Sequence, residues 1–402
     1  MSSVPDINRK DLQDLQKLSR APFLSYLQKQ AQPKIPRSRA SAAKPSAYPL
    51  LAAFAPKNLW KWISEYLRHR FGWKHPFPHY DGKDGDTGVY RLKGTDGEVR
   101  IALAGDWGSG TDEAACVAQR ICEYQPHYSI HLGDVYYVGD AVEVGENFLG
   151  DPNPASKYTP CEWPKGSEGT FALNGNHEMY ARGIGYFDFM LPKLGIRGNV
   201  HGQRASYFCL ENNHWRIIAI DTGYKSVGLP VIEYVLQPDC SLPQELVDWL
   251  RTVVRPNSED PRGIIILSHH QYYSRFDCCY PKPARQLAEF FTRPVLWLWG
   301  HEHRLVIYRE AGIKGGVRAF GRCIGHGGMP VDLPTAAARH DYAVEFVDDR
   351  PYPNDENLCV GFNGFAEMTL SGNGLTLVYV DLNGTRVFSE SWTTDRGHLV
   401  RV

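Results

Sequence analysis

The chain has 402 residues, enough for one large domain with an extension or for two domains. Hydrophobic residues make up 43% and charged residues 22%, which is the composition of an ordinary globular enzyme. The 44 Lys and Arg residues against 45 Asp and Glu residues leave a formal charge of -1, so net charge provides no general attraction to nucleic acid or to an anionic membrane.

Two features of the sequence bear on where in the cell the protein is expected. Residues 1–20 contain no apolar core of the kind a signal peptide needs, and no apolar run approaches the ~18 residues of a membrane span. The nine cysteines are an odd number and are scattered without a CxxC pair, which favours free thiols in a reducing cytosol. We therefore expect a cytoplasmic protein that contacts neither membrane nor nucleic acid.

The first part of the chain predicts an arm followed by a helix. Residues 1–47 are polar and end in a Pro-rich, Ser-rich stretch typical of a linker or surface arm. Over residues 56–73 the apolar positions follow the spacing i, i+3, i+4, i+7, i+8 of one helical face: Leu59, Trp62, Ile63, Tyr66 and Leu67. We expect residues 1–96 to form an N-terminal arm and helical extension, and residues 97–402 to form the catalytic domain.

From Val99 onward the pattern predicts an α/β fold. Helices are expected over 111–124, with Thr111 as N-cap, and over 242–254. Residues 365–393 alternate and contain the turns Gly-Asn-Gly and Asn-Gly, which predicts an antiparallel meander. Buried strands are predicted by short apolar runs rich in β-branched and aromatic residues, at 99–105, 128–133, 171–175, 216–222, 263–269 and 295–301.

Polar clusters follow five of these strands, where loops of open α/β sheets place their ligand sites. A single Gly-Asp or His-x-His is unspecific, but five clusters together supply carboxylate, amide, phenol and imidazole groups. Hard oxygen donors mixed with imidazoles suit Fe, Mn or Zn better than Ca or a cysteine-based structural zinc. The clusters are Gly105-Asp106-Trp107-Gly108, Gly133-Asp134-Val135-Tyr136-Tyr137, Asn174-Gly175-Asn176-His177-Glu178, Ser268-His269-His270-Gln271 and Gly300-His301-Glu302-His303.

The motifs GDWG, GDxxY, GNHE, a His at a strand end and GHxH, in this order, resemble the calcineurin-like metallophosphoesterase superfamily. Within that superfamily the set is most similar to the purple acid phosphatase branch. The resemblance covers roughly residues 97–402. It implies a four-layer αββα sandwich and a dinuclear-metal hydrolase of phosphate esters.

Carried over position by position, the resemblance implies two metal sites and one catalytic histidine. His177 would stand beside the substrate phosphate and the leaving oxygen as a proton donor. Iron is implied at the first site, and Fe, Mn or Zn at the second. The ligands would be Asp106, Asp134, Tyr137 and His303 at the first metal, and Asp134, Asn176, His269 and His301 at the second, with Asp134 bridging.

Two positions depart from the broad pattern of the superfamily. Where most members carry a histidine ligand in the first motif, this chain has Gly108, and Tyr137 would supply a phenolate in its place. Spacing from Asp134 favours Tyr137 as the ligand, and Tyr136 is interpreted as a packing aromatic. At the fourth motif His269 is the expected ligand, and its neighbour His270 would support the ligands or lie near substrate.

Other residues near the motifs have less specific assignments. Glu178 and Glu302 would either orient the metal ligands or be solvated loop acids. Loops over 138–169, 272–285 and 326–360 are expected to line or cover the pocket. Arg275, Lys282 and His326 in and near these loops are candidates for phosphate contacts.

The expected reaction is hydrolysis of a small-molecule phosphomonoester by hydroxide generated at the metals. The alternative is a phosphodiesterase acting on cyclic nucleotides or phospholipid-derived diesters, which would share this metal set. Outside enzymes, the alternative is a non-catalytic phosphate-binding module on the same scaffold, which should have lost ligands. The sequence indicates neither the native metals nor an oligomeric state.

Overall fold

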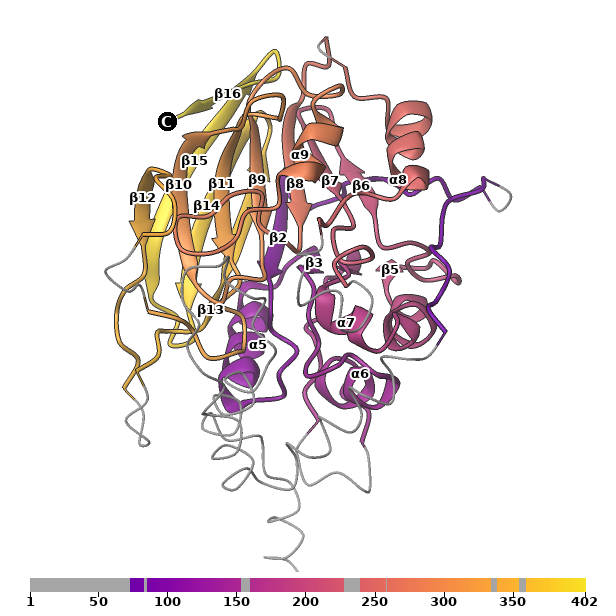
Figure 1. Cartoon of the computed structure of the whole chain (residues 1–402), viewed down its shortest axis with the longest axis vertical. Coiled ribbons are helices and arrows are strands. Elements are labelled where there is room, and N and C mark those ends of the chain that lie inside the picture. The colour runs from indigo at the N-terminus through magenta and orange to yellow at the C-terminus, as the bar shows by residue number, and fades with distance from the viewer. Residues whose placement is uncertain are drawn as a thin grey trace, which may run out of the picture.

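The computed structural model describes residues 73–82, 85–152, 160–227, 239–257, 259–333, 338–353 and 359–402 (Figure 1). The described residues do not include the arm predicted over 1–47. They also do not include the helix predicted over 56–73, apart from its last residue, Trp73. Within the predicted extension, strand β1 joins the edge of a sheet through parallel pairing with β6. The boundary at residue 96 between extension and catalytic domain stays a prediction.

Two eight-stranded sheets form the centre of the molecule (Figure 1). The first sheet has the order β1-β6-β7-β8-β9-β11-β10-β12 and the second the order β16-β15-β14-β13-β2-β3-β4-β5. Strands of the first sheet are Val89–Arg91 (β1), Phe208–Glu211 (β6), Trp215–Ala219 (β7), Gly263–Ser268 (β8), Val295–Trp299 (β9), Leu305–Ala311 (β10), Ala319–Ile324 (β11) and Val344–Val347 (β12). Strands of the second sheet are Glu98–Ala104 (β2), Tyr128–His131 (β3), Gly169–Ala172 (β4), Gly195–Ile196 (β5), Gly364–Ser371 (β13), Gly374–Asp381 (β14), Arg386–Asp395 (β15) and His398–Arg401 (β16).

Parallel strands occupy the middle of both sheets. In the second sheet β2 pairs with β3 and β3 with β4, and in the first β7 pairs with β8 and β8 with β9, all in parallel. Every residue of β3, β4, β7, β8 and β9 is buried, as expected for strands covered on both faces. Each of the six strands predicted from apolar runs is therefore confirmed, with boundaries shifted by a few residues.

Helices cover the outer face of each sheet. Along the second sheet lie Asp112–Tyr124 (α5), Ala141–Asn147 (α6), Asn176–Tyr180 (α7) and the helical turns Gly185–Met190 (η1) and Leu191–Lys193 (η2). Along the first sheet lie Gln244–Trp249 (α8), continued by Leu250–Val254 (η4), and Pro281–Leu287 (α9). The Thr111 side chain accepts the backbone N–H of Ala114 and so caps α5 as predicted.

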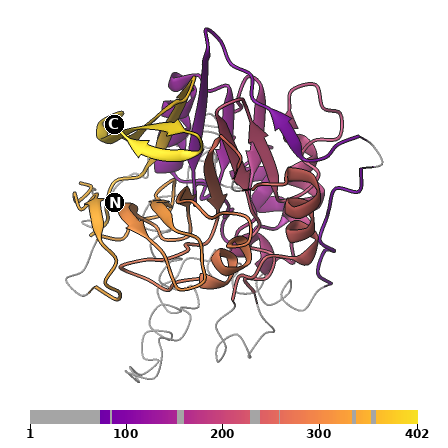
Figure 2. The same cartoon turned by 90° about the horizontal axis from the view of Figure 1, so that it is seen from above.

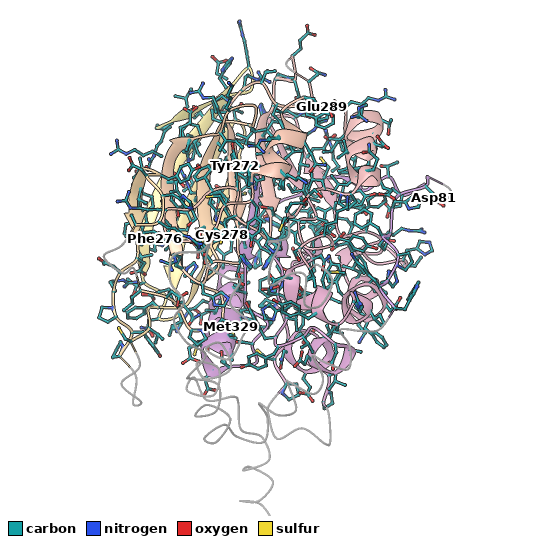
Figure 3. All side chains as sticks on the ribbon, viewed as in Figure 1. Asp81, Tyr272, Phe276, Cys278, Glu289 and Met329 are labelled. Atoms are coloured by element: carbon teal, nitrogen blue, oxygen red, sulfur yellow. The ribbon has the colours of Figure 1, made fainter. Side chains whose placement is uncertain are left out.

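Three hydrophobic cores show that the protein has four layers. One core lies between the sheets and contains Leu103 of β2 and Leu267 of β8. A second lies between the first sheet and α8 and α9, and a third between the second sheet and α5, α6 and η1. Figure 2 shows the sheets and the flanking helices from above. Figure 3 shows that side chains fill the spaces between these layers. The predicted αββα sandwich is confirmed.

The predicted meander is present as β13, β14 and β15, which pair antiparallel in sequence order. Its first strand also pairs antiparallel with β2 over Ala366–Ser371. This long-range pairing attaches the C-terminal hairpins to the strand that precedes Asp106. The C-terminal segment thus extends the sheet that carries the first motif.

All nine cysteines lie within the described residues and are free there. Cys209, Cys240 and Cys323 are buried and fill core space. Among the described residues, no helix combines the length and the apolar character that crossing a membrane would require.

Candidate metal centre

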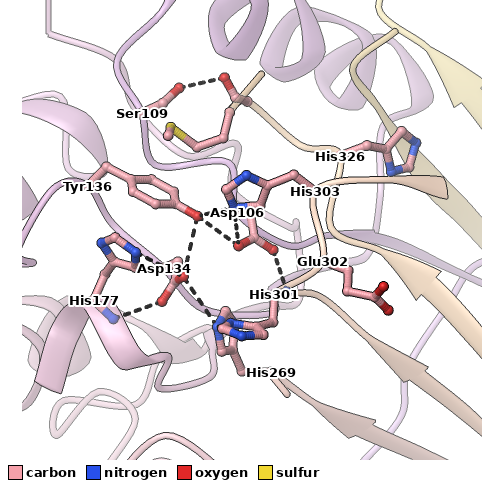
Figure 4. A network of polar contacts seen from close by, with 12 residues as sticks. Asp106, Ser109, Asp134, Tyr136, His177, His269, His301, Glu302, His303 and His326 are labelled. Carbon is pink, nitrogen blue, oxygen red and sulfur yellow. Dashed lines mark hydrogen bonds and ion pairs between the residues drawn. The ribbon is translucent and has the colours of Figure 1, made fainter. Parts of the chain in front are cut away.

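The five polar clusters meet where strands of the two sheets end. Asp106 follows β2, Asp134 follows β3, and Asn176 and His177 begin α7 after β4 in the second sheet. From the first sheet, His269 follows β8, and His301 and His303 follow β9. Parallel strands end at one edge of a sheet, where their loops place ligand sites. The labelled side chains from both sheets lie together at this place (Figure 4).

The first group of donors surrounds the hydroxyl of Tyr136. This hydroxyl lies 2.7 Å from Asp106 Oδ1, 3.3 Å from Asp134 Oδ2 and 2.9 Å from His303 Nε2. His303 Nε2 is also 3.2 Å from Asp106 Oδ1. Two carboxylates, a phenol and an imidazole therefore converge on one small volume (Figure 4).

The second group surrounds Nε2 of His269. That nitrogen lies 3.3 Å from Asp134 Oδ2, 3.1 Å from Asn176 Oδ1 and 3.3 Å from His301 Nδ1. His269 Nδ1 is 2.9 Å from the Leu132 carbonyl oxygen, to which it donates, so Nε2 is the nitrogen that faces the group. Asp134 Oδ2 belongs to both groups, in the position expected of a bridging ligand.

Backbone conformation aims these side chains. Asp106, Asp134 and His301 all have positive φ, at 59°, 74° and 62°, in the left-handed region that non-glycine residues rarely adopt. Gly133 precedes Asp134 with φ 103°, and a Cβ on it would lie 2.7 Å from His269 Nδ1. Only glycine allows this close approach, which explains the Gly-Asp pair of the second motif.

The two neighbouring tyrosines have places different from those expected. The interpretation of Tyr136 as a packing aromatic is wrong, because its hydroxyl reaches both carboxylates and His303. Tyr137, assigned as ligand from its spacing, instead brings its backbone carbonyl oxygen to within 2.6 Å of His177 Nδ1. The structure therefore places the Tyr136 hydroxyl in the first group, and the role of Tyr137 as a ligand stays a prediction. Asn147 of α6 supports this placement by donating to the Tyr136 carbonyl at 2.8 Å.

There is no room at position 108 for a side chain. Most members of the superfamily are expected to carry a histidine ligand at this position. A Cβ on Gly108 would lie 2.9 Å from Cα of Val135. The Gly108 carbonyl accepts the backbone N–H of Tyr136 at 2.9 Å. The loops after β2 and β3 thus pack directly against each other at this glycine, and this contact holds the segment that carries Tyr136.

Glu178 and Glu302 are both buried, so the interpretation of either as a solvated loop acid is wrong. The Glu178 carboxylate accepts the backbone N–H groups of Asp134, Val135 and Gly175 at 3.2, 2.7 and 2.8 Å. It therefore fixes the second motif to the third. Glu302 accepts from the Ser274 hydroxyl at 2.6 Å and so connects the GHxH loop to the loop after β8.

Two buried carboxylates, those of Asp106 and Asp134, place negative charge in the protein interior. Burial disfavours the carboxylate of Asp134, but the neighbouring His269 and His177 outweigh burial and hold the pKa of Asp134 well below its ordinary value. Burial likewise opposes the charged form of His269, yet the Asp134 carboxylate raises the pKa of His269 to about 9. A positive neighbour thus favours the charged form of Asp134, as a metal cation would also do.

His177 is fixed at two points beside Asp134. Its backbone N–H donates to Asp134 Oδ1 at 3.0 Å, and its Nδ1 donates to the Tyr137 carbonyl at 2.6 Å. Nε2, 3.7 Å from Asp134 Oδ2, is then the nitrogen left for other chemistry. Its ring lies against Tyr136 and Tyr180. Burial lowers the pKa of His177 and so disfavours the protonated ring.

The donors present fit a dinuclear metal centre. Ligand atoms of Asp106, Asp134 and His269 all lie within 4.8 Å of one another, and so do those of His269, His270 and His301. The set mixes carboxylate, phenol and amide oxygens with imidazole nitrogens and contains no thiol, as suits Fe, Mn or Zn. Asp106, Asp134, Tyr136 and His303 would hold one ion, and Asp134, Asn176, His269 and His301 the other.

The three residues predicted as candidates for phosphate contacts, Arg275, Lys282 and His326, differ in what they contact. The Arg275 guanidinium donates to the Tyr342 carbonyl at 3.2 Å, and Lys282 forms an ion pair with Asp239. His326 is buried and lies to one side of the ligand cluster (Figure 4). Their contact with phosphate stays a prediction.

Support from the end of β7 was not foreseen from the sequence. Asp221 accepts from the Asn174 side chain at 3.1 Å, and Thr222 contacts His270. The strand over 216–222 was predicted from the sequence. Polar residues at its end, Asp221 and Thr222, are the local feature that could have indicated contacts with the site.

Comparison with known proteins identifies the family of this chain. The sequence matches the calcineurin-like phosphoesterase family over residues 99–305, more than half of the chain. The chain belongs to the calcineurin-like phosphoesterases. The match covers the strands that carry all five polar clusters, and it implies divalent metal ions and a phosphoester-hydrolysing family.

Solved structures give more distant likenesses. GAP50 of Plasmodium, described as the anchor in the inner membrane complex, is 14% identical with a TM-score of 0.44, over 74% of this chain and 89% of that one. The purple acid phosphatase PPD1 from yellow lupin (Lupinus luteus) seeds is 14% identical with a TM-score of 0.46, over 74% and 54%. PhoD is 10% identical with a TM-score of 0.45, over 77% and 72%. Among curated proteins no sequence matches this chain.

Proposed function

We propose that this calcineurin-like phosphoesterase hydrolyses small-molecule phosphomonoesters at a dinuclear centre of the purple acid phosphatase type. The position of Asp134 Oδ2 carries the proposal, because that oxygen lies 3.3 Å from the Tyr136 hydroxyl and 3.3 Å from His269 Nε2. One carboxylate thus joins a phenol-containing donor group to an imidazole-containing one. A single-metal site has no need of two such groups.

Each part of the site has a separate task in this proposal. Two cations held there would bind the phosphate oxygens, stabilise the charge of the transition state and activate water. Asp134 and the buried carboxylate of Asp106 fix the spacing of the two groups. His177, whose Nδ1–H is held by the Tyr137 carbonyl, presents Nε2 to the leaving oxygen and, in its protonated form, donates a proton there.

Comparing two chromogenic esters tests this function. We expect protein reconstituted with Fe, Mn or Zn to turn over p-nitrophenyl phosphate with a kcat/KM at least about tenfold above that for bis(p-nitrophenyl) phosphate. Asp134→Ala, which removes the shared ligand, should abolish both reactions and provides the matched blank.

Two other outcomes would contradict the proposal in different ways. A preference for the bis ester would make the protein a phosphodiesterase on the same metal set. Binding of two metal equivalents without turnover of either ester would indicate a non-catalytic phosphate-binding module.

The tyrosine of the first group can be identified by colour. A phenolate bound to ferric iron gives a visible charge-transfer band, and phenolate is a hard donor that suits Fe(III). We expect iron-loaded, oxidised protein to absorb in the visible range. Tyr136→Phe should remove the band and weaken iron binding, because the Tyr136 hydroxyl lies 2.7 Å from Asp106 Oδ1 and 3.3 Å from Asp134 Oδ2.

Tyr137→Phe is the matched control, since the backbone carbonyl that contacts His177 is unchanged in that variant. Loss of the band in Tyr137→Phe with retention in Tyr136→Phe would restore Tyr137 as the ligand. A wild-type protein that binds ferric iron without any band would rule out the purple acid phosphatase branch and leave the two-metal hydrolase.

A further inference from the structure

His270 stands directly after the predicted ligand His269 at the end of β8, and it is buried with 3% of its surface exposed. Its backbone N–H donates to the Thr222 hydroxyl at 3.0 Å. Its Nδ1 lies 3.1 Å from the same hydroxyl oxygen. Thr222 is itself buried, so both ends of this contact are held within the protein.

The Thr222 hydroxyl engages Nδ1 of His270 and leaves Nε2 as the other nitrogen of the ring. The Thr222 oxygen already accepts one N–H from the His270 backbone, and its second lone pair can accept Nδ1–H. A histidine whose Nδ1–H is held in this way presents the lone pair of Nε2, which is the usual arrangement of a metal-binding imidazole with a supporting partner.

The His270 ring packs against two imidazoles and against the ring of Tyr280, whose centroid lies 5.0 Å away. The His270 ring centroid lies 4.7 Å from that of His269 and 4.5 Å from that of His301. One nitrogen from each of the three rings falls within a 4.8 Å cluster. A histidine that only fills space has no reason to place its nitrogen among those of two predicted ligands.

We propose that His270 is an additional ligand, through Nε2, of the second metal, and that Thr222 is its positioning residue. The inference rests on the dinuclear centre of the proposed function. It adds a third imidazole to Asp134, Asn176, His269 and His301. Because imidazole suits zinc and iron, whereas manganese favours carboxylate, carbonyl and water ligands, the added ring makes the second site selective for Zn or Fe over Mn.

Metal titration tests the proposal without reference to activity. Chelator-stripped full-length protein is titrated calorimetrically with Zn²⁺ and separately with Mn²⁺. We expect His270→Phe, which keeps a ring of similar size, to weaken one of the two Zn²⁺ binding events. Loss of a residue that only supports a ligand typically lowers metal affinity by about 10–100-fold, and loss of a ligand should lower it by more. The same variant should change Mn²⁺ binding less, and so narrow the Zn-to-Mn selectivity of that site.

A second pair of variants keeps the test decisive if His270→Phe does not fold. Thr222→Val removes the hydroxyl and should weaken the same Zn²⁺ event by about 10–100-fold, whereas Thr222→Ser keeps the hydroxyl and should restore it. His214→Phe, at an exposed histidine, is the matched control and should bind both ions as the wild type does.

The outcomes separate this inference from the proposed function. Two wild-type Zn²⁺ events that are unchanged in both His270→Phe and Thr222→Val would show that His270 only packs, while the dinuclear centre stands. A wild-type protein that binds fewer than two metal equivalents would overturn the proposed function and this ligand together.

Discussion

Replacing His177 with alanine is expected to lower kcat by about 10²–10⁴-fold, the range typical of general acid–base groups. Metal content should stay at the wild-type level, because His177 Nδ1 is engaged by the Tyr137 carbonyl and its Nε2 is 3.7 Å from Asp134 Oδ2. The loss should be large for alkyl phosphates and smaller for p-nitrophenyl phosphate, whose leaving group needs less protonation. Steady-state kinetics on both substrates and metal analysis of the same samples provide the measurement.

The direction of the pH dependence follows from the surroundings of His177. Burial lowers its pKa, so the protonated form is present at acidic pH and is depleted as the pH rises. If His177 acts as the proton donor, kcat for alkyl phosphates should fall with rising pH, and His177→Ala should flatten this fall. His201→Ala, at an exposed histidine, should leave rates and profile unchanged. Equal losses on alkyl and p-nitrophenyl substrates would contradict the acid role.

Breaking one buried ion pair is expected to destabilise the whole sandwich. Arg322 of β11 in the first sheet contacts Glu390 of β15 in the second through two bonds of 2.6 Å, and both side chains are buried. The Tyr379 hydroxyl also donates to Glu390 at 2.9 Å. Glu390→Gln would leave the Arg322 charge uncompensated between the sheets, at a cost of about 3–5 kcal/mol in the free energy of unfolding.

The double variant Arg322→Met, Glu390→Leu separates the pair from its surroundings. Replacing both charges with apolar groups should recover most of the loss, because a buried pair pays a large desolvation cost. Urea unfolding of the three proteins measures these differences through the midpoint and slope. A Glu390→Gln variant as stable as the wild type would show that the pair contributes nothing.

The dependence of the free energy of unfolding on acidic pH provides a second test of the same ion pair. Burial would raise the pKa of Glu390, but the Arg322 guanidinium outweighs it and lowers that pKa below the ordinary value of 4.5. A lowered folded-state pKa means that the stabilisation is complete above the unfolded value and is lost as pH falls through the folded one. Wild-type stability should therefore decline below about pH 4.5, more steeply than that of the double variant.

Much of the site could be predicted from the sequence because its ligands sit in short motifs at strand ends. Asp106, Asp134, Asn176, His269, His301 and His303 were named from such motifs, and the structure brings all six together. The position of the Tyr136 hydroxyl could not be predicted, because spacing along a chain does not fix the direction of a side chain in a loop. The contacts of the loop after β3 with Gly108 and Asn147 turn the Tyr136 hydroxyl toward the carboxylates.

The sequence alone determined the strands, the α/β class, the capped helix after the first motif and the chemistry of the donors, because each depends on local periodicity or residue type. Only the tertiary structure decided which strands are neighbours, and so which motifs face each other across the two sheets. It also decided that Glu178 is buried among three backbone N–H groups and that Thr222 orients His270. These contacts join residues distant in the sequence, and they form only when the two sheets pack and bring their strand ends to one edge.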